Sequence, residues 1–246
     1  MRKMVRMNVK TGALISAAGT VISTIGSFWI ASVSIRSITS VHPSWKWWIT
    51  PLFALALLDG ILPLFYWSLY RFEGRFKFPK SSRTTALLVA CAMGVVLCLE
   101  ALDLAKSRTF PTAPACLSLV GELCCALLLF CISQYRIEED QAPQPKSGVF
   151  FIVTKVAALW GALWIAIGCL QVVATPFVFA VDRHVASGYG RPTPQFAHIL
   201  VPSMERLVSV LCLWITPWLV YTISRRTGTA ESMVTESAVS SRPDTV

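Results

Sequence analysis

The stretch VFFIVTKVAALWGALWIAIGCLQVVATPFVFAV, residues 149–181, decides the fold class because it is apolar over far more residues than a helix of a soluble domain needs. Its single charged residue is Lys155. About 20 predominantly apolar residues are enough for a helix to cross the hydrocarbon core of a bilayer. The stretch therefore predicts a membrane-spanning helix near 149–175, which Pro176 ends or bends.

Further apolar runs of spanning length occur on both sides of this stretch, near 11–35, 47–70, 84–105, 114–135 and 199–223. Apolar residues make up 54% of the chain and charged residues 14%, whereas about 25% of residues are charged in ordinary soluble domains. We expect an all-α, polytopic integral membrane bundle of about six transmembrane helices, a single domain over residues 1–226. The Ser- and Thr-rich segment 227–246 is predicted to be a disordered cytoplasmic tail.

The distribution of Lys and Arg predicts the orientation, because cytoplasmic loops carry the excess of these residues. Most of them fall on one side of the predicted bundle: Arg2, Lys3, Arg6, Lys10, Arg71, Arg75, Lys77, Lys80, Arg83, Arg136, Lys146, Arg225, Arg226 and Arg242. Both termini are therefore predicted to be cytoplasmic. The net charge of +9 reflects this topology. Nucleic-acid binding is not indicated, because the chain lacks a basic run interleaved with aromatic residues in a soluble module.

Small residues follow one face of the first predicted helix. Gly19, Ser23, Ser27 and Ala31 are four positions apart, so they lie on the same side of a helix. Small side chains let helix backbones approach closely in lipid. This face is predicted to pack against another helix.

The segment LALLDGILPLFYW, residues 55–67, places Asp59 inside an apolar run. Aromatic residues at both ends of the predicted 47–70 span put Asp59 near the bilayer midplane, where a charge costs about 2.5–3.5 kcal/mol on insertion scales. Pro63 has no N–H for the Asp59 carbonyl, which predicts a kink at 59–63. Two interpretations remain open: Asp59 lines a functional cavity, or Ser or Thr side chains of the first helix satisfy it.

A second group of charged residues falls in the outer third of the bundle. Glu100 and Glu122 are predicted at comparable depth on antiparallel helices, and Glu205 and Arg206 reach a similar level on the last helix. Arg206 can form a structural ion pair with Glu205 or with Glu122. One arginine cannot neutralise all of these acids, so at least one of them is expected to lack a basic partner. Close carboxylates in a poorly solvated site cannot all stay ionised, and a protonated carboxyl is what a general acid needs.

The sequence carries no recognisable motif for cofactor or metal chemistry. The eight cysteines form no paired Cys-x-x-Cys pattern and the three histidines have no ligand spacing. The sequence has no glycine-rich phosphate loop, no His-box, no aspartate-rich diphosphate motif and no nucleophile elbow. Any activity is therefore expected to be acid–base chemistry with no cofactor and no metal.

These features favour a small membrane-embedded enzyme of cyclase, isomerase or epoxide-opening type, acting on a lipophilic isoprenoid- or polyketide-like substrate. The candidate catalytic residues are Asp59, Glu100, Glu122, Glu205 and Arg206. In size and helical layout the chain is similar in kind to the membrane-integral terpene cyclases of fungal meroterpenoid pathways, which are usually read with seven helices. That resemblance includes no motif and therefore implies no residue role.

Two alternatives to an enzyme remain open. In the first alternative the chain is a non-catalytic membrane subunit or scaffold, whose acids contact a partner membrane protein. In the second it is a proton-coupled transporter, whose acids are proton sites. For every alternative the expected location is a multi-pass position in the bilayer, with the endoplasmic reticulum favoured over the plasma membrane.

Overall fold

The structure, a computed structural model, describes residues 9–41, 58–71, 78–107, 113–134, 148–189 and 195–240. These residues form helices and, within those ranges, no strand. The helices are α1 (Val9–Val41), α3 (Ile61–Arg71), α4 (Lys80–Ser107), α5 (Ala113–Gln134), α6 (Gly148–Gly188) and α7 (Ala197–Ser240). The predicted all-α, polytopic bundle is confirmed.

Five stretches of the described helices are long and apolar enough to cross a membrane: Val9–Val33, Lys80–Leu102, Cys116–Gln134, Gly148–Gly188 and Ala197–Arg225. The sixth predicted span, near 47–70, is represented by α3 and the residues just before it, since its first part lies outside the described residues. Large apolar side chains point outward along the spans, among them Leu170 and Val173, which are 66% and 75% exposed. Such a surface suits contact with lipid and not with water.

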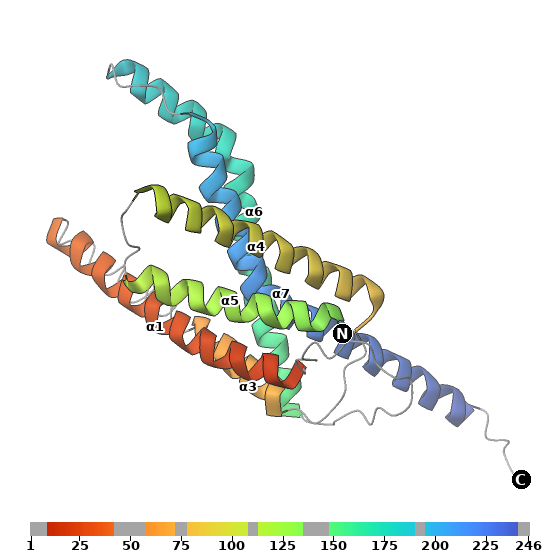
Figure 1. The fold of residues 1–246 in the computed structure, drawn as a ribbon. Helices are drawn as coiled ribbons and strands as arrows, with labels where there is room; N and C mark the ends of the chain where they lie inside the picture. Colours follow the sequence, from red (N-terminus) through yellow and green to blue (C-terminus); the bar gives the residue numbers. More distant parts are fainter. Residues whose placement is uncertain are drawn as a thin grey trace, which may run out of the picture.

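Helix α5 is the centre of the arrangement, because it packs against α1, α4 and α7. Helix α3 packs against α1 and α6, and α6 pairs with α7 along a hairpin that crosses the other helices (Figure 1). In the same view α1 and α4 end, and α5 begins, toward the left end of the bundle. The start of α1 lies at the opposite end, and α7 runs toward that end as it approaches the C-terminus.

The contact between α1 and α5 depends on glycine. A Cβ atom built on Gly19 would lie 2.6 Å from Cβ of Cys124, and one built on Gly121 would lie 2.5 Å from Cβ of Ser23. The Ser16 hydroxyl donates a hydrogen bond to the Cys124 carbonyl across this contact, at 3.0 Å. The predicted small-residue packing face of α1 is confirmed, since Gly19 and Ser23 are buried against α5.

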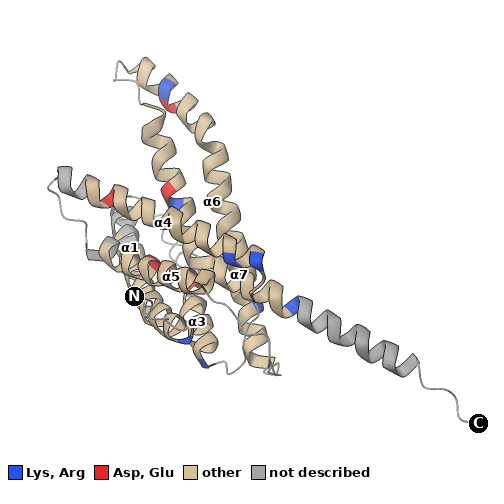
Figure 2. Ribbon diagram, turned by 45° about the vertical axis from the view of Figure 1, so that its right-hand side comes forward, with Lys and Arg blue, Asp and Glu red and all other residues tan. Residues whose placement is uncertain are grey.

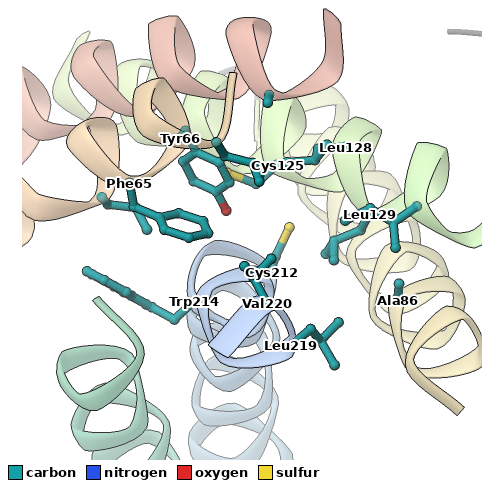
Figure 3. Close-up of a cluster of buried hydrophobic side chains, with 14 of the residues drawn as sticks. Phe65, Tyr66, Ala86, Cys125, Leu128, Leu129, Cys212, Trp214, Leu219 and Val220 are labelled. Atoms are coloured by element: carbon teal, nitrogen blue, oxygen red, sulfur yellow. The ribbon is translucent and has the colours of Figure 1, made fainter. Parts of the chain in front are cut away.

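The buried core lies where α3, α5 and α7 meet (Figure 3). Tyr66 is fully buried there, and its hydroxyl donates to the Leu213 carbonyl of α7 at 3.0 Å. That carbonyl has no helical partner, because the residue four positions later is Pro217, which lacks an N–H. A side chain of α3 thus satisfies a backbone group that the proline of α7 leaves free.

Three prolines lie inside long helices, at positions 176, 202 and 217. Helix α6 runs through Pro176 to Gly188, so the predicted end near residue 175 is too early. A proline removes one backbone hydrogen bond, and the neighbouring turns of a membrane helix retain theirs. Helix α7 continues to Ser240. The segment expected to be a disordered tail, 227–246, therefore begins inside a helix, and residues 241–246 lie outside the described part.

The helical pattern is interrupted at Gly60, between residues 58–59 and α3. This break lies within the 59–63 interval where Asp59 and Pro63 predict a kink. A glycine at the break costs little, since it has no side chain to restrict the backbone. The interruption brings Asp59 to the end of α3 that faces α6.

Candidate functional site

Acidic residues of the described chain lie on several helices (Figure 2), and the acidic candidates among them form two groups. Asp59 interacts with α6, whereas Glu100, Glu122 and Glu205 interact with one another across α4, α5 and α7. Asp59 is not among the groups that act electrostatically on Glu100 or Glu122. The candidate residues predicted from the sequence therefore form two sites.

Asp59 is held by two tryptophans of α6. The indole N–H groups of Trp160 and Trp164 each donate a hydrogen bond to Oδ1 of Asp59, and both N···O distances are 3.0 Å. The carboxyl group is half-buried. Its partners are thus indoles of α6, and no Ser or Thr among the described side chains of the first helix donates to it.

The helical repeat explains why two tryptophans reach one oxygen. Trp160 and Trp164 are four positions apart, so their side chains lie on one face of α6. Their rings stand edge to face, with centroids 6.1 Å apart and planes at 85°. The sequence analysis did not predict this contact, and the four-residue spacing of the two tryptophans is the one signal that pointed to a shared polar partner.

Glu122 is the most enclosed carboxyl group of the second site, at 7% exposed. The Ser209 hydroxyl of α7 donates to its Oε2 at 3.1 Å, and the Ser118 hydroxyl, one turn earlier on α5, donates to its Oε1 at 3.3 Å. The Cys212 thiol donates to the Glu122 backbone carbonyl at 3.3 Å. Helices α5 and α7 therefore meet around this residue through polar contacts.

Glu100 lies between the other two acids in electrostatic terms. Its carboxyl group is repelled by Glu205, and it in turn repels Glu122. Its Oε2 atom is buried and accepts no hydrogen bond from the described part of the chain. The structure thus places Glu100, Glu122 and Glu205, which the sequence predicts at similar levels on separate helices, near enough for Glu100 to interact with both of the others.

The basic candidate does not join this group. Arg206 is exposed, and it is not among the groups that act on Glu100 or Glu122. The structure therefore gives no support to the ion pair between Arg206 and Glu122. Asp103 is three positions before Lys106, a spacing that predicts an ion pair on one helix face, and both side chains lie outside the described part.

A metal ion finds no ready site here: within the described ranges no group of three or more His, Cys, Asp or Glu side chains is arranged to hold one. The two serines that donate to Glu122 are hydrogen-bond partners that sequence reasoning missed. Ser209 lies four positions after Glu205 on α7, so the helical repeat puts it on the acidic face. Carboxyl groups that lie this near one another can hold and exchange a proton.

Comparison with protein-family models, with curated proteins and with solved structures finds no match to this chain. The similarity of size and layout to membrane-integral terpene cyclases is thus not accompanied by a detectable similarity of sequence or fold.

Proposed function

We propose that the chain is a membrane-embedded enzyme that carries out cofactor-free acid–base chemistry on a lipophilic substrate. The observation that carries the proposal is Glu122, which is enclosed between α5 and α7, lies beside Glu100 and has no described basic partner. Close carboxyl groups in a desolvated site favour a state in which one holds a proton. A carboxylic acid in that state is a proton donor.

In the proposed reaction Glu122 gives its proton to an epoxide oxygen or an alkene carbon of the substrate. The positive charge that develops moves through the substrate by ring closure or bond migration, or water adds to it. Glu100 or Glu205 then takes the proton released at the end. Exchange of one proton among the three carboxyl groups returns the site to its starting state. Cyclisation, isomerisation and epoxide opening all fit this scheme.

The hydrogen bonds of Glu122 fix its position for this role, since Ser209 and Ser118 hold both carboxyl oxygens from two helices. Glu100 keeps a buried oxygen without a described hydrogen-bond donor, and this oxygen is free to take the proton that the substrate releases. A substrate dissolved in the bilayer reaches such a site from the lipid, and an endomembrane such as the endoplasmic reticulum is the location that this function favours.

The test replaces Glu122→Gln in the source organism and compares lipophilic extracts by mass spectrometry. The change keeps the side-chain shape and removes the transferable proton. We expect the product to fall by about 10²–10⁴-fold, the usual contribution of a general acid or base, with accumulation of a precursor of equal mass or of a mass lower by one water. Glu205→Gln is expected to act in the same direction.

The matched control is Asp182→Asn, because Asp182 is an exposed acid of α6 that is not among the groups acting on Glu100 or Glu122. Extracts from this variant should equal those of the wild type. Immunoblots of the membrane fraction check that each variant is inserted in equal amount. If Glu122→Gln leaves every lipophilic metabolite unchanged at equal protein level, the chain is not an enzyme of this kind.

A second candidate function, a non-catalytic membrane subunit, is favoured by Arg206. Its side chain is exposed within a predicted span, and a charge at that depth is stabilised by an opposite charge. An acidic residue on a helix of another membrane protein meets this need. Loss of a co-purifying membrane protein on Arg206→Gln, without any change in metabolites, would favour this second candidate over the enzyme.

A further inference from the structure

The Asp59 carboxyl group has one oxygen that its tryptophan partners do not use. Both indole N–H groups meet Oδ1. Oδ2 accepts no hydrogen bond from the residues that the structure describes. An ionised carboxylate has about four acceptor positions, so the group retains room for another donor.

Within the described ranges no cationic side chain balances the charge of Asp59. The side chains that act on it are Trp160 and Trp164, and no Lys, Arg or His of the described ranges is among them. Indole N–H groups stabilise a negative charge through hydrogen bonds but carry no positive charge. An anion within a bilayer is favourable only when a cation or a proton accompanies it.

The surroundings of this site are apolar and open toward lipid. Leu58, directly before Asp59, is 45% exposed, and Leu163, between the two tryptophans, is 47% exposed. A molecule in contact with Asp59 therefore extends into hydrocarbon. Indole rings also attract cations to their faces, and the edge-to-face arrangement of Trp160 and Trp164 leaves ring faces in two orientations.

We propose that Asp59, Trp160 and Trp164 form a binding site for the protonated amine of a lipophilic molecule. The ammonium N–H donates to Oδ2 of Asp59, the two indoles fix the carboxylate through Oδ1, and the hydrocarbon part of the ligand lies along the lipid-facing surface beside Leu58 and Leu163. The inference stands apart from the proposed acid–base reaction, because it involves no residue of the Glu122 site.

The test measures binding and not turnover. The full chain is reconstituted in lipid nanodiscs and titrated with N,N-dimethyldecylamine, which is cationic at neutral pH, and with decan-1-ol, which is neutral and has the same chain length. Empty nanodiscs give the background of partition into lipid. We expect saturable binding of the amine and none of the alcohol. The amine should also raise the melting temperature of the wild-type protein, whereas the alcohol should not.

The decisive variant is Asp59→Asn, which keeps a carbonyl oxygen for the two indoles and removes the negative charge. Loss of a charge-assisted hydrogen bond should weaken amine binding by about 10- to 100-fold. Asp182→Asn, the exposed acid of α6, should leave it unchanged. Trp164→Phe removes one of the two donors that fix the carboxylate and should weaken binding by a smaller factor.

Three results would overturn the proposal. They are equal affinity of the wild type and Asp59→Asn, equal saturable binding of the amine and the alcohol, and an equal response of the wild-type melting temperature to both probes. The last result needs no variant, so the proposal stays testable if Asp59→Asn does not fold.

Discussion

At the scale of single residues, some polar groups within the bundle have hydrogen-bond partners on other helices. Tyr66 of α3 donates to the Leu213 carbonyl of α7, and Ser209 of α7 donates to Glu122 of α5. A buried polar group left without a partner costs about 1–3 kcal/mol. These contacts therefore specify which helices lie together. Apolar side chains specify helix pairs less strictly, because in a bilayer they contact lipid as favourably as they contact another helix.

The Tyr66 contact gives a prediction at this scale. Tyr66→Phe should lower the free energy of unfolding by about 1–3 kcal/mol, because it leaves the buried Leu213 carbonyl without a donor. In a Pro217→Ala background the same change should cost less, since the N–H restored at position 217 can bond that carbonyl. Thermal or denaturant unfolding in detergent measures the four proteins of this cycle.

The matched control for this cycle is Tyr70→Phe, because the Tyr70 hydroxyl makes no hydrogen bond with the described residues and its ring contacts Trp67. It should have little effect in either background. An equal cost of Tyr66→Phe with and without Pro217 would show that the hydroxyl does not compensate for the proline. The coupling is expected to be about 1 kcal/mol or more, as for groups in one hydrogen-bond network.

At the scale of the helices, α1 and α5 are close because both present small residues to the contact. Gly19 and Ser23 of α1 face Gly121 and Cys124 of α5. Helix α6 approaches α7 in the same way, since a Cβ atom on Gly161 would lie 2.9 Å from Cβ of Trp214. In lipid the attraction between helices comes largely from such close packing.

Gly121→Ala tests the α1–α5 contact. The added Cβ atom would lie 2.5 Å from Cβ of Ser23 and 3.1 Å from the Gly19 carbonyl oxygen, so one helix must move. Overpacking of this kind typically costs about 1–3 kcal/mol. Melting in detergent should detect the loss, and a second change, Ser23→Gly, should recover part of it.

Gly94→Ala is the control for this prediction, because nothing lies within 4 Å of the Cβ atom it adds to α4. Alanine is favoured over glycine inside a helix by about 0.5–1 kcal/mol. This variant should therefore be as stable as the wild type or slightly more stable. A destabilisation equal to that of Gly121→Ala would mean that helix contacts do not determine the effect.

At the scale of the whole molecule, the distribution of charge and the path of the chain agree. Lys10, Arg71, Lys80, Arg83 and Arg225 lie at the start of α1, the end of α3, the start of α4 and the end of the last span. These positions belong to one side of a bundle with alternating helices. The positive-inside rule assigns that side to the cytoplasm.

Protease protection on sealed vesicles tests this orientation. Tags inserted at residue 246 and in the loop after Arg71 should both be cleaved when the cytoplasmic face is outside, because both are predicted on that side. A tag in the segment between α4 and α5 should be protected. Protection of the tag at residue 246 together with cleavage of the loop after Arg71 would contradict an even number of spans.

The sequence by itself determined the fold class and the approximate positions of most spans. Hydropathy is a local property, so apolar runs such as 149–181 predict helices without knowledge of their neighbours. The small-residue face at Gly19 and the irregular backbone near Asp59 followed from helical spacing and from Pro63 for the same reason. The short connection between α4 and α5 also predicted that these helices are antiparallel neighbours, with Glu100 and Glu122 at comparable levels.

Only the tertiary structure decided which side chains meet. Depth does not define the rotation of a helix about its axis, and that rotation determines that Asp59 contacts Trp160 and Trp164, that Glu122 contacts Ser209, and that Arg206 is exposed. The same holds for the Tyr66 contact with the carbonyl freed by Pro217. Rotation is set by packing over the whole bundle. These hydrogen bonds form between residues 87 to 147 positions apart in the chain, beyond the reach of any local pattern.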